Sequence, residues 1–248
     1  SPEQVMERLN QYSKFPVPEN VSKEILETMA RYGLVRLVRH EGKFLLEGDD
    51  EGLMNEIWKS SAVNSFFAED REEDGRIEVL KNFRGPLKMA MAKQRFPVED
   101  LAGYITGASL EVKLRDAMVC NGKPFAPRDY QNEAANVFYA SGGIKGGSGV
   151  IVLPCGAGKT IVGIASMALA QTRTLILSPN IIAARQWRRE IMDKTELTED
   201  QVKEYSGERK EIGDVTVATY QILTSSTKKG ANAHFDLFEK NKWGLVIY

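Results

Sequence analysis

Apolar residues recur every three or four positions through much of the first half of the chain, which is the spacing of amphipathic helices. Two short apolar runs on either side of Glu41-Gly42 interrupt this pattern and predict a β-hairpin. Asp49 or Asp50 can cap the helix that follows. We therefore expect a small α+β domain, with strands over 34–39 and 43–46 and with helices over 3–12, 20–32, 85–96 and the segment that carries Leu53, Ile57 and Trp58.

From residue 125 onward, helix-like and strand-like segments alternate, which is the pattern of a parallel sheet flanked by helices. The turn-rich residues 121–124 precede this change, so we place a domain boundary there and expect domains at 1–120 and 121–248. The expected fold class is α/β, with an N-terminal α+β domain before the parallel sheet. The second domain should contain helices over 129–140, 160–170 and up to Lys194, and strands over 149–153, 174–177, 215–218 and 245–247.

The composition is that of an ordinary globular protein. Of 248 residues, 42% are hydrophobic and 27% are charged, and the net charge is −1. Residues 1–120 carry 17 basic and 21 acidic side chains, and residues 121–248 carry 16 and 13, so neither half is basic enough to indicate nucleic-acid binding by charge alone. No apolar run approaches the roughly 20 residues of a membrane span. We expect a cytoplasmic protein with no membrane partner.

The cysteines and histidines exclude several kinds of site. Cys120 and Cys155 form no C-x-x-C motif, which argues against a zinc site and against a disulfide framework. The only histidines are His40 and His234, which argues against a histidine-based metal site or a catalytic triad.

Residues 153–160, Leu-Pro-Cys-Gly-Ala-Gly-Lys-Thr, form a candidate phosphate-binding loop between an apolar strand and an apolar helix. A triphosphate requires inward-pointing backbone N–H groups, the positive end of a helix dipole, an ammonium group and a hydroxyl for magnesium. Lys159 would reach the β- and γ-phosphates, and Thr160 would bind Mg²⁺. The wrapped backbone would come from Pro154, Cys155, Gly156, Ala157 and Gly158.

Further motifs occur around this loop in the order used by superfamily 2 helicases. Arg128-Asp129-Tyr130-Gln131 precedes it, and Ala183-Ala184-Arg185-Gln186-Trp187 and Ala218-Thr219-Tyr220-Gln221 follow it. Leu153 replaces the first glycine of the general loop pattern, a departure that helicase-like ATPases tolerate. Together with residues 12–18, 32–38 and 96–104, these motifs resemble the XPB family of DNA-dependent ATPases, in a bacterial form. The resemblance implies a damage-recognition-like domain with its bridge, followed by the first RecA-like ATPase domain.

The resemblance also implies a function and a set of site residues. The function is that of an ATP-dependent DNA helicase or duplex translocase of 3′→5′ polarity, acting in nucleotide excision repair and, as a further role, in transcription. Gln131 with Arg128 would read the adenine and make the site specific for ATP. The DNA backbone would be contacted by Ser178, Pro179 and Asn180, by Thr219 and, as a weaker candidate, by Arg185. A nuclease or another repair or transcription protein is the implied partner.

We expect the chain to stop just before the acidic pair of motif II, because nothing follows the strand-like run at 243–248. Without those carboxylates and the second RecA-like domain, the chain alone should lack ATPase activity. Two alternatives stay open. One is a different P-loop enzyme such as a nucleotide kinase, against which the helicase-type motifs argue. The other is a non-catalytic DNA- or partner-binding adaptor with a relic phosphate-binding loop.

Overall fold

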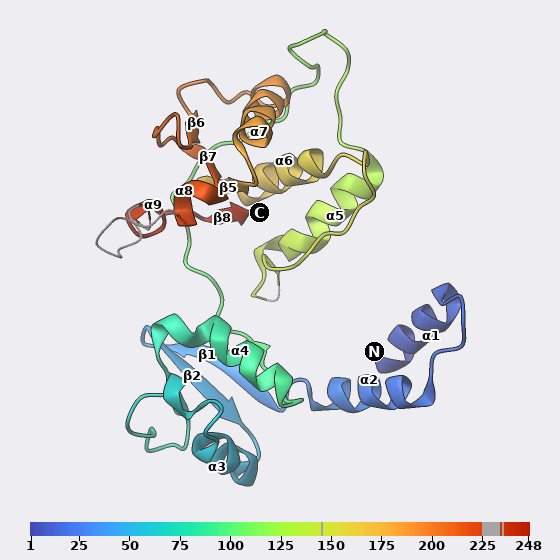
Figure 1. Cartoon of the computed structure of the whole chain (residues 1–248), viewed down its shortest axis with the longest axis vertical. Coiled ribbons are helices and arrows are strands. Elements are labelled where there is room, and N and C mark those ends of the chain that lie inside the picture. The colour runs from blue at the N-terminus through green and yellow to red at the C-terminus, as the bar shows by residue number, and fades with distance from the viewer. Residues whose placement is uncertain (145, 225–233, 235) are drawn as a thin grey trace. The chain divides into compact units, whose positions relative to one another are not determined.

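The computed structural model describes residues 1–144, 146–224, 234 and 236–248. It divides the chain into two units, Ser1–Gly103 and Tyr104–Tyr248 (Figure 1). The division lies upstream of the boundary near residue 120 that the sequence suggested. The two units are built on separate sheets and separate hydrophobic cores.

Residues 104–125 belong to the second unit because backbone hydrogen bonds and apolar burial attach them to it. The backbone N–H of Leu110 donates to Gln171 O at 3.1 Å, and that of Arg115 donates to Lys194 O at 2.9 Å. Leu110 is also buried in the core of this unit. The expected turn at 121–124 does form, with Gly122 at a φ of +68°, but it lies inside the second unit and links no domains.

The first unit contains a four-stranded sheet of order β3-β2-β1-β4. Its strands are β1 (Val35–His40), β2 (Lys43–Gly48), β3 (Ile77–Val79) and β4 (Glu99–Asp100), and its helices are α1 (Pro2–Tyr12), α2 (Glu19–Arg31), α3 (Glu51–Lys59) and α4 (Arg84–Lys93), with short 3-10 turns at Asn64–Phe66 and Lys81–Phe83. The predicted hairpin joins β1 to β2, and Glu41 and Gly42 have the positive φ values, 49° and 81°, that a tight two-residue turn requires.

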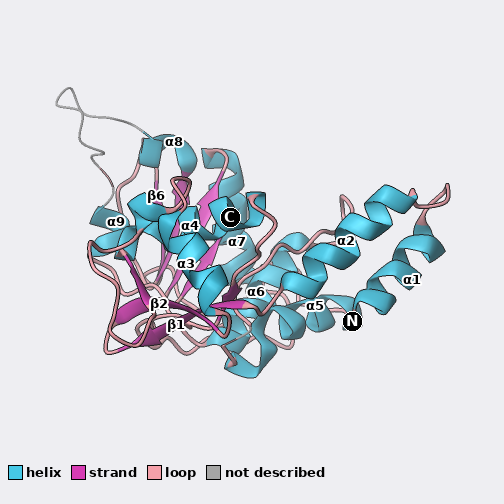
Figure 2. Cartoon of the chain, turned by 90° about the horizontal axis from the view of Figure 1, so that it is seen from below, coloured by secondary structure: helices cyan, strands magenta, loops and turns pink. Residues whose placement is uncertain are grey.

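The core of the first unit lies on one face of this sheet. Residues of β1, β2 and β3 pack there against α3 and α4, and the helix residues Leu87 and Met91 are fully buried. Helices α1 and α2 lie side by side and have no buried residues (Figure 2). Each predicted helix of this unit is therefore present, within a few residues of its predicted bounds.

The second unit contains a parallel four-stranded sheet of order β6-β7-β5-β8, as the alternating pattern predicted. Apolar side chains of α6 and α7 cover one face of the sheet, and residues of α8 and α9 cover the other. Helix α5 packs against α6 through Ala135, Val162 and Ala165. The elements are α5 (Asp129–Tyr139), a 3-10 turn at Ala140–Gly142, α6 (Lys159–Ala170), β5 (Thr174–Ser178), α7 (Ile181–Lys194), β6 (Val202–Tyr205), β7 (Val215–Thr219), α8 (Tyr220–Thr224), α9 (Asp236–Glu239) and β8 (Leu245–Ile247).

The strand predicted at 149–153 is not formed, and that prediction was wrong. The segment pairs with none of the described strands, and Val150 and Val152 are 85% and 86% exposed. A run of β-branched residues has high strand propensity, but that propensity depends on packing and pairing with a neighbouring strand. Among the helices of the described ranges, none is long and apolar enough to cross a lipid bilayer.

Asp100 ties the last strand of the first unit to α4. Its carboxylate accepts two hydrogen bonds from Arg84, at 2.9 and 3.0 Å, and one from Lys88 at 2.9 Å, and its side chain is only 10% exposed. Burial alone would raise the pKa of Asp100, but the hydrogen bonds from the two cations outweigh it and lower the pKa below its usual value.

Asp100→Asn should therefore destabilise the first unit by about 2–3 kcal/mol at neutral pH, since it leaves two cations partly unpaired. Because the pKa is lower in the folded protein, the wild-type carboxylate stabilises the fold above the ordinary aspartate pKa of about 3.9, and this contribution is lost as the pH falls through the folded value. Hydrogen exchange of the β1 amides against pH measures both effects. Exposed Asp70→Asn is the control, and a wild-type advantage that persists at low pH would contradict the assignment.

A close backbone crossing fixes the start of the second unit. A Cβ atom added to Gly107 would lie 2.2 Å from the backbone N of Gly244 and 2.5 Å from the Thr172 hydroxyl. The Thr172 hydroxyl donates to Ala108 O at 2.8 Å at the same point. Only a residue without a side chain fits there.

Gly107→Ala should lower the stability of the second unit by about 1–3 kcal/mol, since the backbone of Gly244 cannot move aside as a side chain could. Gly149→Ala is the matched control, because a Cβ atom there meets nothing within 4 Å. Urea unfolding of the two variants measures the difference. Equal unfolding midpoints would show that the backbone at Gly107 and Gly244 can shift to accommodate a Cβ atom without loss of stability.

Candidate functional site

The predicted phosphate-binding loop forms a tight turn directly before α6. Gly156 and Gly158 both adopt left-handed backbone conformations, with φ values of +80° and +79°. Residues with a Cβ atom rarely adopt this conformation, which explains why the motif has glycine at both positions. The loop therefore ends at the N-terminus of a 12-residue helix, where unpaired N–H groups and the helix dipole favour an anion.

Lys159 and Thr160 begin α6 and follow the loop. The Lys159 ammonium donates to the backbone O of Pro154 at 3.2 Å, so its side chain lies across the loop. Lys159 is exposed and Thr160 is half-buried. An exposed ammonium held by one carbonyl can exchange that carbonyl for a phosphate oxygen, because a hydrogen bond between charged partners is stronger.

Gln131 lies against the loop. It is 5% exposed, and its side-chain N–H donates to Ala157 O at 2.9 Å while its side-chain oxygen accepts from the backbone N–H of Arg128 at 2.9 Å. The hydroxyl of Tyr130 donates to the same Ala157 oxygen at 2.7 Å. Both the N–H and the oxygen of the Gln131 side-chain amide are thus hydrogen-bonded, and these bonds connect the start of α5 to the loop.

The candidate DNA-contacting residues Ser178 and Thr219 end neighbouring parallel strands, and their Cα atoms are register partners. Both side chains are 1% exposed. The Ser178 hydroxyl donates to Asn180 O and Ala218 O, each at 3.2 Å. The Ser178 side chain therefore shapes the turn that follows β5, in which Pro179 and Asn180 are exposed.

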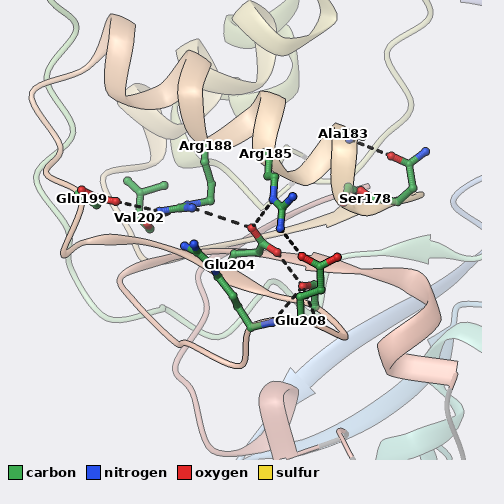
Figure 3. A network of polar contacts seen from close by, with 11 residues as sticks. Ser178, Ala183, Arg185, Arg188, Glu199, Val202, Glu204 and Glu208 are labelled. Atoms are coloured by element: carbon green, nitrogen blue, oxygen red, sulfur yellow. Dashed lines mark hydrogen bonds and ion pairs between the residues drawn. The ribbon is translucent and has the colours of Figure 1, made fainter.

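Asn180 caps α7, since its side-chain oxygen accepts from the backbone N–H of Ala183 at 2.9 Å. Arg185 lies one turn further along this helix and forms ion pairs with Glu204 and Glu208 (Figure 3). Hydrogen bonds to Glu208 and Glu204 raise the pKa of the Arg185 guanidinium. The sequence identified Arg185 but gave no sign of these partners.

The structure thus brings the predicted residues together as two groups. One group is the loop with Lys159, Thr160, Gln131 and the backbone of Arg128. The other lies where β5 and β7 end and comprises the turn at 178–180, Thr219 and Arg185. Tyr130, Glu204 and Glu208 contact these groups as well, and no motif in the sequence indicates their roles. In the described ranges, no group of three or more His, Cys, Asp or Glu side chains is arranged to hold a metal ion.

Comparison with known proteins agrees with the motifs. The family model described as type III restriction enzyme, res subunit, matches residues 124–248, and the model described as helicase conserved C-terminal domain matches residues 1–72. The DNA 3′-5′ helicase XPB of Mycobacterium tuberculosis is 43% identical over 99% of this chain and 43% of that protein. The chain belongs to the XPB family of superfamily 2 helicases.

Other XPB-family relatives match over nearly the whole chain. The DNA 3′-5′ helicase XPB of Kineococcus radiotolerans is 42% identical over 99% of this chain and 42% of its own length. The general transcription and DNA repair factor IIH helicase/translocase subunit XPB of Encephalitozoon cuniculi is 26% identical over 98% of this chain and 36% of its own length. This chain therefore spans less than half the length of the curated XPB relatives that it matches.

Gln131→Glu tests whether the buried amide supports the loop of this XPB-family chain. A carboxylate cannot donate to Ala157 O and would place a buried negative charge against that oxygen, which among the described residues keeps only the Tyr130 hydroxyl as a donor, so the variant should lose about 1–3 kcal/mol of local stability. Hydrogen exchange of the amides at 156–160 should become faster. Gln186→Glu, the same change at an exposed position of α7, is the control, and equal exchange rates in the two variants would exclude a supporting role.

Proposed function

We propose that this chain is the nucleotide-binding and DNA-contacting part of an ATP-dependent 3′→5′ DNA helicase or duplex translocase of the XPB type. The observation that carries the proposal is the loop before α6, in which Gly156 and Gly158 both adopt left-handed φ values. Such a turn at a helix N-terminus suits the phosphates of a nucleotide. The names of the XPB relatives support helicase activity as the use of this site.

In this proposal the loop residues Pro154, Cys155, Gly156, Ala157 and Gly158 bind the phosphates through their backbone. Lys159 exchanges Pro154 O for a β- or γ-phosphate oxygen, and the Thr160 hydroxyl is a ligand of Mg²⁺. Gln131 and Arg128 contact the adenine. Because the Gln131 amide is already bonded to Ala157 O and to the Arg128 N–H, adenine recognition requires at least one of these bonds to be shared or exchanged.

DNA would be bound at the carboxyl edge of the parallel sheet, through its phosphates and without base reading. Ser178 and Thr219 are buried there, so their part would be to shape turns whose backbone groups face the DNA. Pro179, Asn180 and Arg185 are exposed at this edge. Repair and transcription as the biological setting, with a repair or transcription protein as partner, follow from what the relatives are named for.

We further propose that the chain alone binds ATP but does not hydrolyse it. Magnesium prefers a near-octahedral shell that includes carboxylates, and the described residues offer no cluster of three or more ligating side chains. Thr160 is then the only protein ligand proposed for the metal. Stabilising the charge that develops in phosphoryl transfer requires more groups than these.

Calorimetric titration of ATP, with magnesium and with a chelator, tests this proposal. We expect measurable binding to the wild-type chain, at least about tenfold weaker binding to Lys159→Ala, and a gain from magnesium of less than about tenfold, which is roughly 1.4 kcal/mol. DNA-stimulated ATPase activity should not exceed that of Lys159→Ala.

The other outcomes discriminate among the alternatives. A magnesium gain above tenfold would mean that another side chain completes the metal shell. A wild-type chain that binds DNA but no nucleotide would favour the non-catalytic adaptor with a relic loop. Turnover well above the Lys159→Ala background would refute the inactivity of the chain alone.

A further inference from the structure

Arg185 is held by two carboxylates in different surroundings (Figure 3). Its Nε donates to Glu204 at 3.3 Å, and its Nη2 donates to Glu208 at 2.5 Å. The Glu204 side chain is 1% exposed, whereas the Glu208 side chain is 60% exposed. A single guanidinium therefore connects a buried carboxylate to an exposed one.

Glu204 is fixed by partners other than Arg185. The hydroxyl of Ser206 donates to one of its oxygens at 2.7 Å, and Arg188 lies 4.0 Å from the other. The Nε of Arg188 in turn donates to Val202 O at 3.2 Å. Moving a buried carboxylate away from these partners would leave its charge unpaired, which is costly. Glu204 therefore holds the Nε side of the Arg185 guanidinium in place.

Glu208 has a fixed backbone but an accessible side chain. The buried Ser206 hydroxyl accepts hydrogen bonds from the backbone N–H groups of Glu208 and Arg209, at 3.2 and 3.3 Å, and so fixes the turn that carries Glu208. The ion pair that the side chain makes with Arg185 is open to solvent, and exposed ion pairs are weak. A competing anion can therefore replace Glu208 without disturbing the turn.

The turn with Glu208 follows the end of β6. Because β6, β7 and β5 are parallel, it lies at the same edge of the sheet as the turns after β5 and β7. This is the edge where the proposed function puts the DNA backbone. A phosphate offers a guanidinium the same paired oxygens as a carboxylate, so Glu208 and a DNA phosphate compete for the same face of Arg185.

We propose that Glu208 is an internal competitor for DNA: it occupies Arg185 in the free protein and is displaced by a DNA phosphate, while Glu204 keeps the guanidinium oriented. This inference rests on the proposed function and adds to it a residue that weakens DNA binding. The two carboxylates then have opposite effects. Removing the charge of Glu208 strengthens DNA binding, and removing the charge of Glu204 weakens it.

The test is fluorescence anisotropy of a labelled random-sequence DNA duplex titrated with the full 248-residue chain over a range of salt concentrations. Glu208→Gln should bind about three- to fivefold tighter than wild type, the gain expected from removing an exposed ion-pair partner. Glu204→Gln should bind more weakly. Arg185→Gln should bind more weakly too, with a salt slope shallower by about one unit, as for one lost phosphate contact.

Two controls separate competition from a general loss of negative charge. Glu199→Gln removes the same charge from an exposed carboxylate that pairs with Arg188 at 3.7 Å and does not touch Arg185, so its affinity should stay near that of wild type. The double variant Arg185→Gln/Glu208→Gln should bind like Arg185→Gln alone. Thermal unfolding checks that each variant is folded. If Glu204→Gln does not fold, the DNA affinity of Glu208→Gln compared with those of wild type and Glu199→Gln still decides the proposal.

Each other outcome has a separate meaning. If Glu208→Gln binds no tighter than Glu199→Gln, or if its gain persists without Arg185, the competition is refuted while the wild-type affinity still supports the proposed DNA binding. If neither wild type nor Glu208→Gln binds the duplex at any salt concentration, the competition and the proposed DNA contact both fail.

Discussion

Parallel pairing of β5 with β7 on one side and with β8 on the other is the constraint on which the second unit depends. In a parallel sheet the carboxyl ends of all strands lie at the same edge. The turns that follow β5, β6 and β7 are therefore brought together whatever their sequences are. The central strand is covered on both faces, with Leu175 and Ile176 buried in different clusters. Helix positions, and with them Arg185, follow from that packing.

The first unit depends on a different principle. Its main core lies on one face of the sheet, and polar contacts secure the last short strand. Asp100 lies on a strand of two residues, too short to be held by backbone pairing alone. The bonds from Arg84 and Lys88 supply the attachment, which explains why a charged side chain occupies a largely buried position there.

Local signals in the sequence were sufficient for the hairpin and for the longer helices, α1 to α7, but not for the short helices α8 and α9. Caps such as Asp50 and Asn180 and the glycine of the β1–β2 turn act within a few residues of themselves, so their effect can be predicted without the rest of the fold. The same holds for Gly156 and Gly158, because their backbone conformations are a property of the loop.

Non-local features could not be predicted in this way. A strand at 149–153 would need a neighbouring strand, and the spacing of apolar residues does not reveal whether one is present. The boundary between the units lies earlier than the sequence suggested, because the backbone N–H of Leu110 donates to Gln171 O, 61 residues later in the chain. Strand β6 was missed because Val-Lys-Glu-Tyr lacks an apolar pattern; Glu204 is buried there through the arginines of α7. The partners of Gln131 and Arg185 could not be predicted either, because they lie far from these residues in the sequence.

The crossing of Gly107 over Gly244 has a mechanical consequence. Ala108, the next residue, donates its backbone N–H to Lys242 O and accepts from the Thr172 hydroxyl and the Arg173 N–H. These bonds attach the beginning of the second unit to the end of its sheet where β5 and β8 begin, ahead of the longer segment that runs on to Phe125. Residues 107 and 108 are thus anchored beside the start of β5, the central strand of this sheet.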